Sequence, residues 1–168
     1  MMVVVICDPF GSAATTSLRA SIWSLLMTAP TRKLFTIEEA NSLIPMLQKT
    51  LDSLQRQVRD IIRLKRQLEV LNLICDGQLS RENVDFQEYL QKTALYHQLV
   101  GQADTLIRDV RARGCLLRDV HTGIVDFYSE MDGKVVFLCW RRGEPGVGYW
   151  HPVGEGYGQR RSIAGLSS

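Results

Sequence analysis

Residues 126–151 read DFYSEMDGKVVFLCWRRGEPGVGYWH. Val, Phe and Trp are frequent here, as they are in β-strands, and Asp132-Gly133 is a strong signal for a two-residue hairpin turn. This pattern predicts antiparallel strands over residues 123–130 and 134–142. A turn around Pro145 then leads to a third strand over residues 147–153, and residues 115–117 are a candidate for a short edge strand. The stretch therefore predicts a three-stranded antiparallel meander.

The turn also predicts which residues face one another. Counting outward from it puts Asp126 opposite Cys139. If the second hairpin centres on Pro145, Cys139 in turn lies opposite His151. Directly opposed residues share one face of a sheet, with their β-carbons about 4.5–5.5 Å apart. We therefore expect Asp126, Cys139 and His151 to form one row.

The two faces of the predicted sheet differ in polarity. One is uniformly apolar and is the expected core face against the helices; its residues are Val125, Phe127, Val136, Leu138, Trp140 and Trp150. The face that carries the row is mixed, with Ile124, Tyr128, Phe137, Tyr149 and Val153. We expect it to be a half-buried second surface.

Three interpretations of the row stay open. Cysteine, histidine and aspartate are all competent ligands for zinc or a similar divalent metal. Alternatively, His151 lowers the pKa of Cys139 and activates its thiol for catalysis. The third and commonest arrangement is a small buried cysteine beside a hydrogen-bonded histidine and a surface aspartate. Glu144 and Arg160 are candidates for supporting residues at the edge of the row.

The chain before the meander has helical periodicity. Thr36 and Glu39 fit a capping box, which satisfies the free amides of a first helical turn. Apolar residues then recur at steps of three and four, as in a coiled-coil seam; they are Ile44, Leu47, Leu51, Leu54, Val58, Ile61, Leu64, Leu68, Leu71 and Cys75. This pattern predicts a helix over residues 37–75, kinked at Pro45.

A second helix is expected over residues 84–113, ending before Gly114. Its candidate core positions are Phe86, Leu90, Leu95, Leu99, Leu106 and Val110. Two long helices joined by a short loop pack as an antiparallel hairpin. The fold class is therefore α+β, with a long helical hairpin packed against the small sheet. The seam is longer than these partners cover, which predicts self-association as a homodimer.

A basic stripe runs along the first helix beside the seam: Arg56, Arg59, Arg63 and Arg66. Such a stripe binds phosphates or an acidic protein partner, or is simply a solvated face, which is the commoner case. The net charge of +2 gives no support for nucleic-acid binding.

The cysteines and the apolar runs indicate the compartment. No two of the four cysteines form a C-x-x-C pair; they are Cys7, Cys75, Cys115 and Cys139. We interpret them as reduced thiols of a cytoplasmic protein. No apolar run approaches the roughly 18–20 residues of a membrane span, so we expect no membrane association.

Residues 1–34 differ in character from the rest of the chain. They are expected to be a disordered or wrongly assigned extension, with Met27 as an alternative start and an organellar transit peptide as the other interpretation. The predicted domain covers residues 35–163, divided into a hairpin over 35–114 and a sheet over 115–163. Residues 164–168 form a tail.

Several short motifs occur in an order that resembles a known family. They are FTIEEA at 35–40, GIVDF at 123–127, LCW at 138–140, GE at 143–144, YWH at 149–151 and GYGQR at 156–160. Over residues 35–163 the chain is similar to the bacterial proteins grouped as domain-of-unknown-function family 2203. The resemblance implies a soluble bacterial protein, and no activity or catalytic residue is carried over from it.

No complete catalytic signature is present, which favours a non-enzymatic interaction or regulatory protein that acts through its helical hairpin. The alternatives are a metal-binding protein and a thiol-dependent enzyme, both at the row of Asp126, Cys139 and His151.

Overall fold

The computed structural model describes residues 33–74 and 85–165. Two helices come first, α2 (Ile37–Ile74) and α3 (Phe86–Ala112). The strands follow as β1 (Cys115–Asp119), β2 (Ile124–Met131), β3 (Lys134–Arg141), β4 (Tyr149–Pro152) and β5 (Arg161–Ser162). Short 3-10 helices lie at Tyr157–Gln159 and Ile163–Gly165. The expected extension lies outside the described residues up to position 32, as does the end of the expected tail.

Helix α2 begins at the predicted capping box. The backbone amide of Thr36 donates to Oε2 of Glu39 at 3.0 Å, and the amide of Glu39 donates to Oγ1 of Thr36 at 3.1 Å. The helix continues through Pro45 as one element. Its seam is buried as predicted from Ile44 to Leu68, apart from the half-buried Val58.

The predicted core stripe of α3 is correct at Leu99, Leu106 and Val110, which pack against or lie in the core, but wrong at Leu90 and Leu95. Leu90 and Leu95 are each 44% exposed, whereas Tyr96, Ala103 and Val110 are buried. The buried residues recur at steps of seven and face the seam of α2, where Tyr96 and Ala103 pack with Leu54, Ile61, Leu64 and Leu68. The long seam is thus covered within one chain, and it no longer supplies a reason for self-association.

The sheet has five strands in the order β1-β2-β3-β4-β5, so the prediction of three strands is wrong. The candidate edge strand is real and forms β1, and the two-residue β5 pairs with β4. The hairpin between β2 and β3 turns at Asp132 and Gly133, with φ of 52° and 71°, as a type I′ turn requires.

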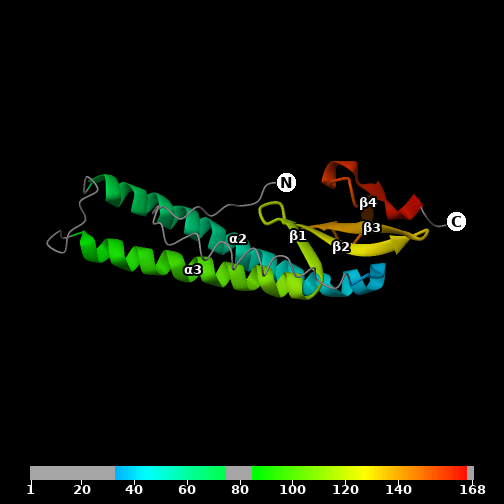
Figure 1. The fold of residues 1–168 in the computed structure, drawn as a ribbon, viewed down its shortest axis with the longest axis horizontal. Helices are drawn as coiled ribbons and strands as arrows, with labels where there is room; N and C mark the ends of the chain where they lie inside the picture. The colour runs from blue at the N-terminus through cyan, green and yellow to red at the C-terminus, as the bar shows by residue number, and fades with distance from the viewer. Residues whose placement is uncertain (1–32, 75–84, 166–168) are drawn as a thin grey trace, which may run out of the picture. The chain divides into compact units, whose positions relative to one another are not determined.

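The sheet packs on the first half of α2 and the end of α3, as Figure 1 shows. The predicted core face is correct, because Val125, Phe127, Leu138 and Trp140 share a cluster with Ile44, Leu47, Leu51 and Val110. The segment before α2 is tied to β2, since the amide of Phe35 donates to the carbonyl of Tyr128 and Oγ of Ser129 donates to the carbonyl of Phe35, both at 2.8 Å. Neither described helix is both long and apolar enough to cross a membrane.

Candidate metal centre

The strand register brings the predicted row together, with one correction. Asp126 pairs with Cys139 as predicted, but His151 pairs with Phe137, and Cys139 pairs with Tyr149. A register shift of two residues keeps every side chain on its face. His151 therefore remains on the face of Cys139, one diagonal step away instead of directly opposite.

Glu144 explains why the second hairpin is not centred on Pro145. The Glu144 amide donates to the carbonyl of Arg141 at 3.0 Å, and its carboxylate accepts from the Arg141 amide at 2.8 Å. Its carbonyl accepts from Nε1 of Trp140 at 3.0 Å. These bonds close a tight turn directly after β3, and Gly143 provides the left-handed conformation at φ 96°.

The three side chains converge in a buried place. One ligand atom from each of Asp126, Cys139 and His151 lies within 4.8 Å of the others. The residues are 2%, 0% and 2% exposed, so the expectation of a surface aspartate on a half-buried face is wrong. Ligand atoms on one zinc ion lie about 3.3–3.8 Å apart, which small side-chain rotations would reach.

Asp126 is only partly satisfied by the protein. Its Oδ2 accepts from Nε of Arg118 at 2.7 Å. Its Oδ1 is buried and accepts no hydrogen bond from an N–H or O–H group of the described residues, while the Cys139 thiol hydrogen-bonds to the same carboxylate. A buried carboxylate oxygen without a donor is costly, so this atom requires an explanation.

His151 presents a lone pair to the same carboxylate. Its Nδ1 lies 3.0 Å from the carbonyl oxygen of Pro152, which only accepts, so Nδ1 must carry a proton. In the neutral ring, Nε2 is then an acceptor, and it lies 3.4 Å from Oδ2 of Asp126. Two acceptors at this separation repel each other unless a proton or a cation is shared between them.

The surroundings of Cys139 oppose an activated thiol. Burial raises the pKa of Cys139 to about 12. The negative charge of Asp126 and a hydrogen bond from the thiol to its carboxylate raise it further, whereas Arg160 lowers it. A thiol with this pKa is almost entirely protonated at neutral pH and is a poor nucleophile. The site therefore does not support the interpretation as a thiol-dependent enzyme.

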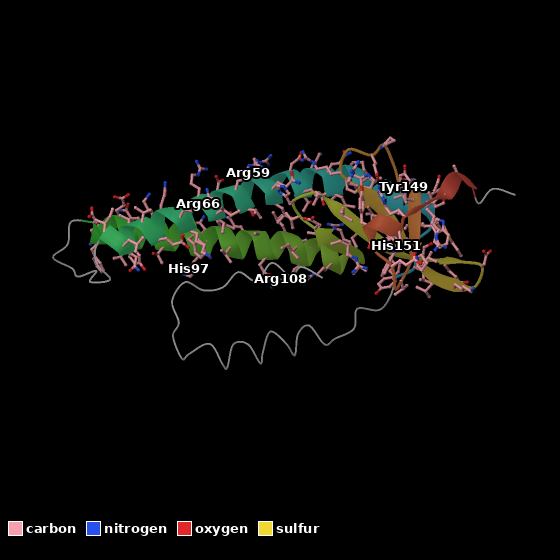
Figure 2. The ribbon with its side chains drawn as sticks, turned by 90° about the horizontal axis from the view of Figure 1, so that it is seen from above. Arg59, Arg66, His97, Arg108, Tyr149 and His151 are labelled. Carbon is pink, nitrogen blue, oxygen red and sulfur yellow. The ribbon has the colours of Figure 1, made fainter. Side chains whose placement is uncertain are left out.

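Two arginines contact the row and help to cover it. The Arg118 side chain, from β1, stacks over the ring of Phe137 at 4.6 Å and reaches Asp126. Arg160 lies over Tyr149 at 4.3 Å and over Tyr157 at 3.8 Å. Figure 2 labels Tyr149 and His151, which both come from β4.

The predicted supporting residues Glu144 and Arg160 are paired with each other. Nη1 of Arg160 lies 2.9 Å from Oε1 of Glu144, and both side chains are largely buried. Nη2 of Arg160 also donates to the hydroxyl of Tyr157 at 2.8 Å. The sequence prediction missed Arg118, because its role depends on β1 lying beside β2.

The basic stripe of α2 lies apart from this centre. Arg56, Arg59, Arg63 and Arg66 are all exposed, and Figure 2 shows Arg59 and Arg66 along the helix. Arg63 pairs with Asp60. Nothing in the stripe reaches Asp126, Cys139 or His151.

Comparisons with known proteins place the described domain in a family. No curated protein and no solved structure matches the chain. The family model described as "Uncharacterized conserved protein (DUF2203)" matches residues 33–163, which span the capped α2 through the last strand. The chain therefore belongs to the DUF2203 family of uncharacterised conserved proteins.

Proposed function

We propose that this protein binds a divalent metal of the zinc type through Asp126, Cys139 and His151. The observation that carries the proposal is the unsatisfied Oδ1 of Asp126, which lies in a buried cluster with a thiol and an imidazole. A cation bonded to the carboxylate, Nε2 and Sγ would satisfy this oxygen and would take the place of a proton shared between Nε2 and the carboxylate.

The donor set selects the class of metal. Thiolate and imidazole favour zinc and its soft or borderline neighbours, whereas magnesium and calcium prefer oxygen ligands throughout. The contacts around the donors also fit, because metal-bound histidines donate their other nitrogen to a carbonyl, and bound carboxylates accept hydrogen bonds themselves. Pro152 and Arg118 supply those contacts for His151 and Asp126.

Burial favours a structural or regulatory metal over a catalytic one. Three protein ligands leave a fourth position, which substrate or water occupies at a catalytic zinc. All three proposed ligands are at most 2% exposed, so a substrate would not reach that position. A metal here would join β2, β3 and β4 at their centre. The proposed role is therefore non-enzymatic: the metal would stabilise the sheet.

The test is metal analysis on protein produced without a histidine tag. We expect one equivalent of bound zinc, or one equivalent of Co²⁺ with a thiolate-to-metal absorption band after exchange. Cys139→Ser should abolish the band. Cys115→Ser is the matched control, because Cys115 is also 0% exposed and lies in the core cluster instead of the row.

Two results would overturn the proposal. One is folded wild-type protein that takes up no stoichiometric metal from a zinc or cobalt solution. The other is metal uptake that the Cys115→Ser variant loses and the Cys139→Ser variant keeps.

Protein–protein interaction through the hairpin is the second candidate function. It is favoured by large apolar side chains exposed near the end of α2, where Leu73 is 78% and Ile74 is 67% exposed. Val70, one turn earlier, is also 53% exposed, and adjoining exposed apolar side chains are typical of protein interaction sites.

A further inference from the structure

The exposed side of α3 is uncharged over its middle turns. Between Lys92 and Asp104 the helix contains no Asp, Glu, Lys or Arg. The exposed residues of this stretch are Ala94, Leu95, His97, Gln98, Gly101 and Gln102. A solvated helix face normally carries many charged residues, so this face has the composition of a surface that is covered.

A hollow of about 510 Å³ lies along the same side, between the two helices. Its wall is uncharged and includes Ser53, Gln57, Gln98, Gly101, Gln102 and Thr105. The hollow is shallow and open to solvent, and both helices of the hairpin contribute to its wall.

Gly101 has no explanation within a single chain. It lies in the interior of α3 and is absent from the glycines with positive φ. A β-carbon built on it meets nothing within 4 Å. Glycine in a helix interior is less favourable than alanine, whereas a close approach of a second backbone does require it.

The chemistry of the face indicates a second copy of this chain. Amide side chains both donate and accept hydrogen bonds, so Gln98 and Gln102 are complementary to themselves across a two-fold axis. A row of like charges is not complementary to itself, so the arginine stripe of α2 would repel the same stripe on a second copy. Figure 2 shows Arg59 and Arg66 along α2 and His97 along α3.

We propose that two copies of the chain associate through the exposed side of α3, with Gly101 beside the two-fold axis. The half-exposed Leu95 lies on this face and would be buried in the dimer. The contact involves neither the metal site nor its ligands, so its test is independent of the test of the proposed function.

The test is the mass in solution, measured by sedimentation equilibrium over a dilution series of the full chain. We expect a dimer that dissociates on dilution, and Gly101→Arg should weaken the association at least about a hundredfold, as hot-spot changes do. Because a side chain at position 101 meets nothing in its own chain, this variant should fold normally, which circular dichroism checks.

Ile62→Arg is the matched control. Ile62 is 47% exposed on α2 among the arginines, so the change adds the same charge to a helix surface outside the proposed contact. Association should survive it. A wild-type monomer across the series, a dimer that Gly101→Arg leaves intact, or a dimer lost in Ile62→Arg instead would each overturn the proposal.

Discussion

Nδ1 of His151 lies 3.0 Å from the carbonyl oxygen of Pro152. This contact assigns the ring proton to Nδ1 and leaves Nε2 as the atom that faces Asp126. A backbone contact within β4 thus leaves Nε2 of His151 facing the carboxylate, in the orientation that the proposed cation would need.

Zinc should raise the melting temperature of the metal-free protein. A ligand at about 100 times its dissociation constant adds about 2.7 kcal/mol of stability, which corresponds to about 5–10 °C for a domain of this size. Differential scanning calorimetry with and without zinc measures the shift. Cys115→Ser should keep it and Cys139→Ser should lose it; an equal shift in both variants would contradict assignment to the row.

Metal binding should release a proton and strengthen as the pH rises. The pKa of Cys139 is raised to about 12, first by burial and then by Asp126, so the free protein holds a protonated thiol at neutral pH. The metal binds the thiolate, and zinc affinity should therefore increase about tenfold per pH unit around neutrality from this group. Calorimetric titration in two buffers of different ionisation enthalpy counts the protons. An affinity that does not change with pH would argue against Cys139 as a ligand.

The buried thiol of Cys115 should destabilise the protein in alkali. Burial raises the pKa of Cys115 from 9.0 to about 11, so the unfolded chain loses this proton first. The contribution is present below about pH 9 and is lost as the pH rises to about 11. Urea unfolding across that range should show a shallower decline in Cys115→Ala than in the wild type. The readout is the slope, because the cavity left by the substitution lowers stability at every pH.

The capping box at the start of α2 should contribute measurably to stability. Thr36→Ala removes the acceptor for the Glu39 amide and should lower the free energy of unfolding by about 1 kcal/mol. Ser42→Ala is the control, since the Ser42 hydroxyl donates back to the helical carbonyl of Glu39 and caps nothing. Equal losses in the two variants, measured by urea unfolding, would show that the cap adds nothing specific.

The sequence predicted those features that depend on short-range geometry. Asp132-Gly133 determines the pairing of Asp126 with Cys139, because a two-residue turn leaves no freedom of register. The turn after β3 is longer, and its centre depends on hydrogen bonds of Glu144 that no periodicity reveals. Hence the face of His151 was predictable and its partner was not.

The burial of the row could not be predicted, because the segments that cover it have no recognisable sequence pattern. Arg160 belongs to a polar, glycine-rich stretch, and the adjoining β5 is only two residues long. In α3, prominent leucines indicated a stripe through Leu90 and Leu95, whereas packing selects Tyr96 and Ala103. A small alanine fits the close contact between helices, and hydrophobicity alone does not rank it above leucine.

The order of strands in the sheet follows the order of the chain, and this has a kinetic consequence. Each strand pairs with its nearest neighbour in sequence. The loops that must close when strands pair are therefore short, and their closure is fast. Docking of the segment before α2 is different, because Phe35 meets Tyr128 only after the whole hairpin has been brought back. During folding, the three proposed ligands should therefore meet early, through the most local contacts of the domain, and the attachment of the sheet to α2 should come later.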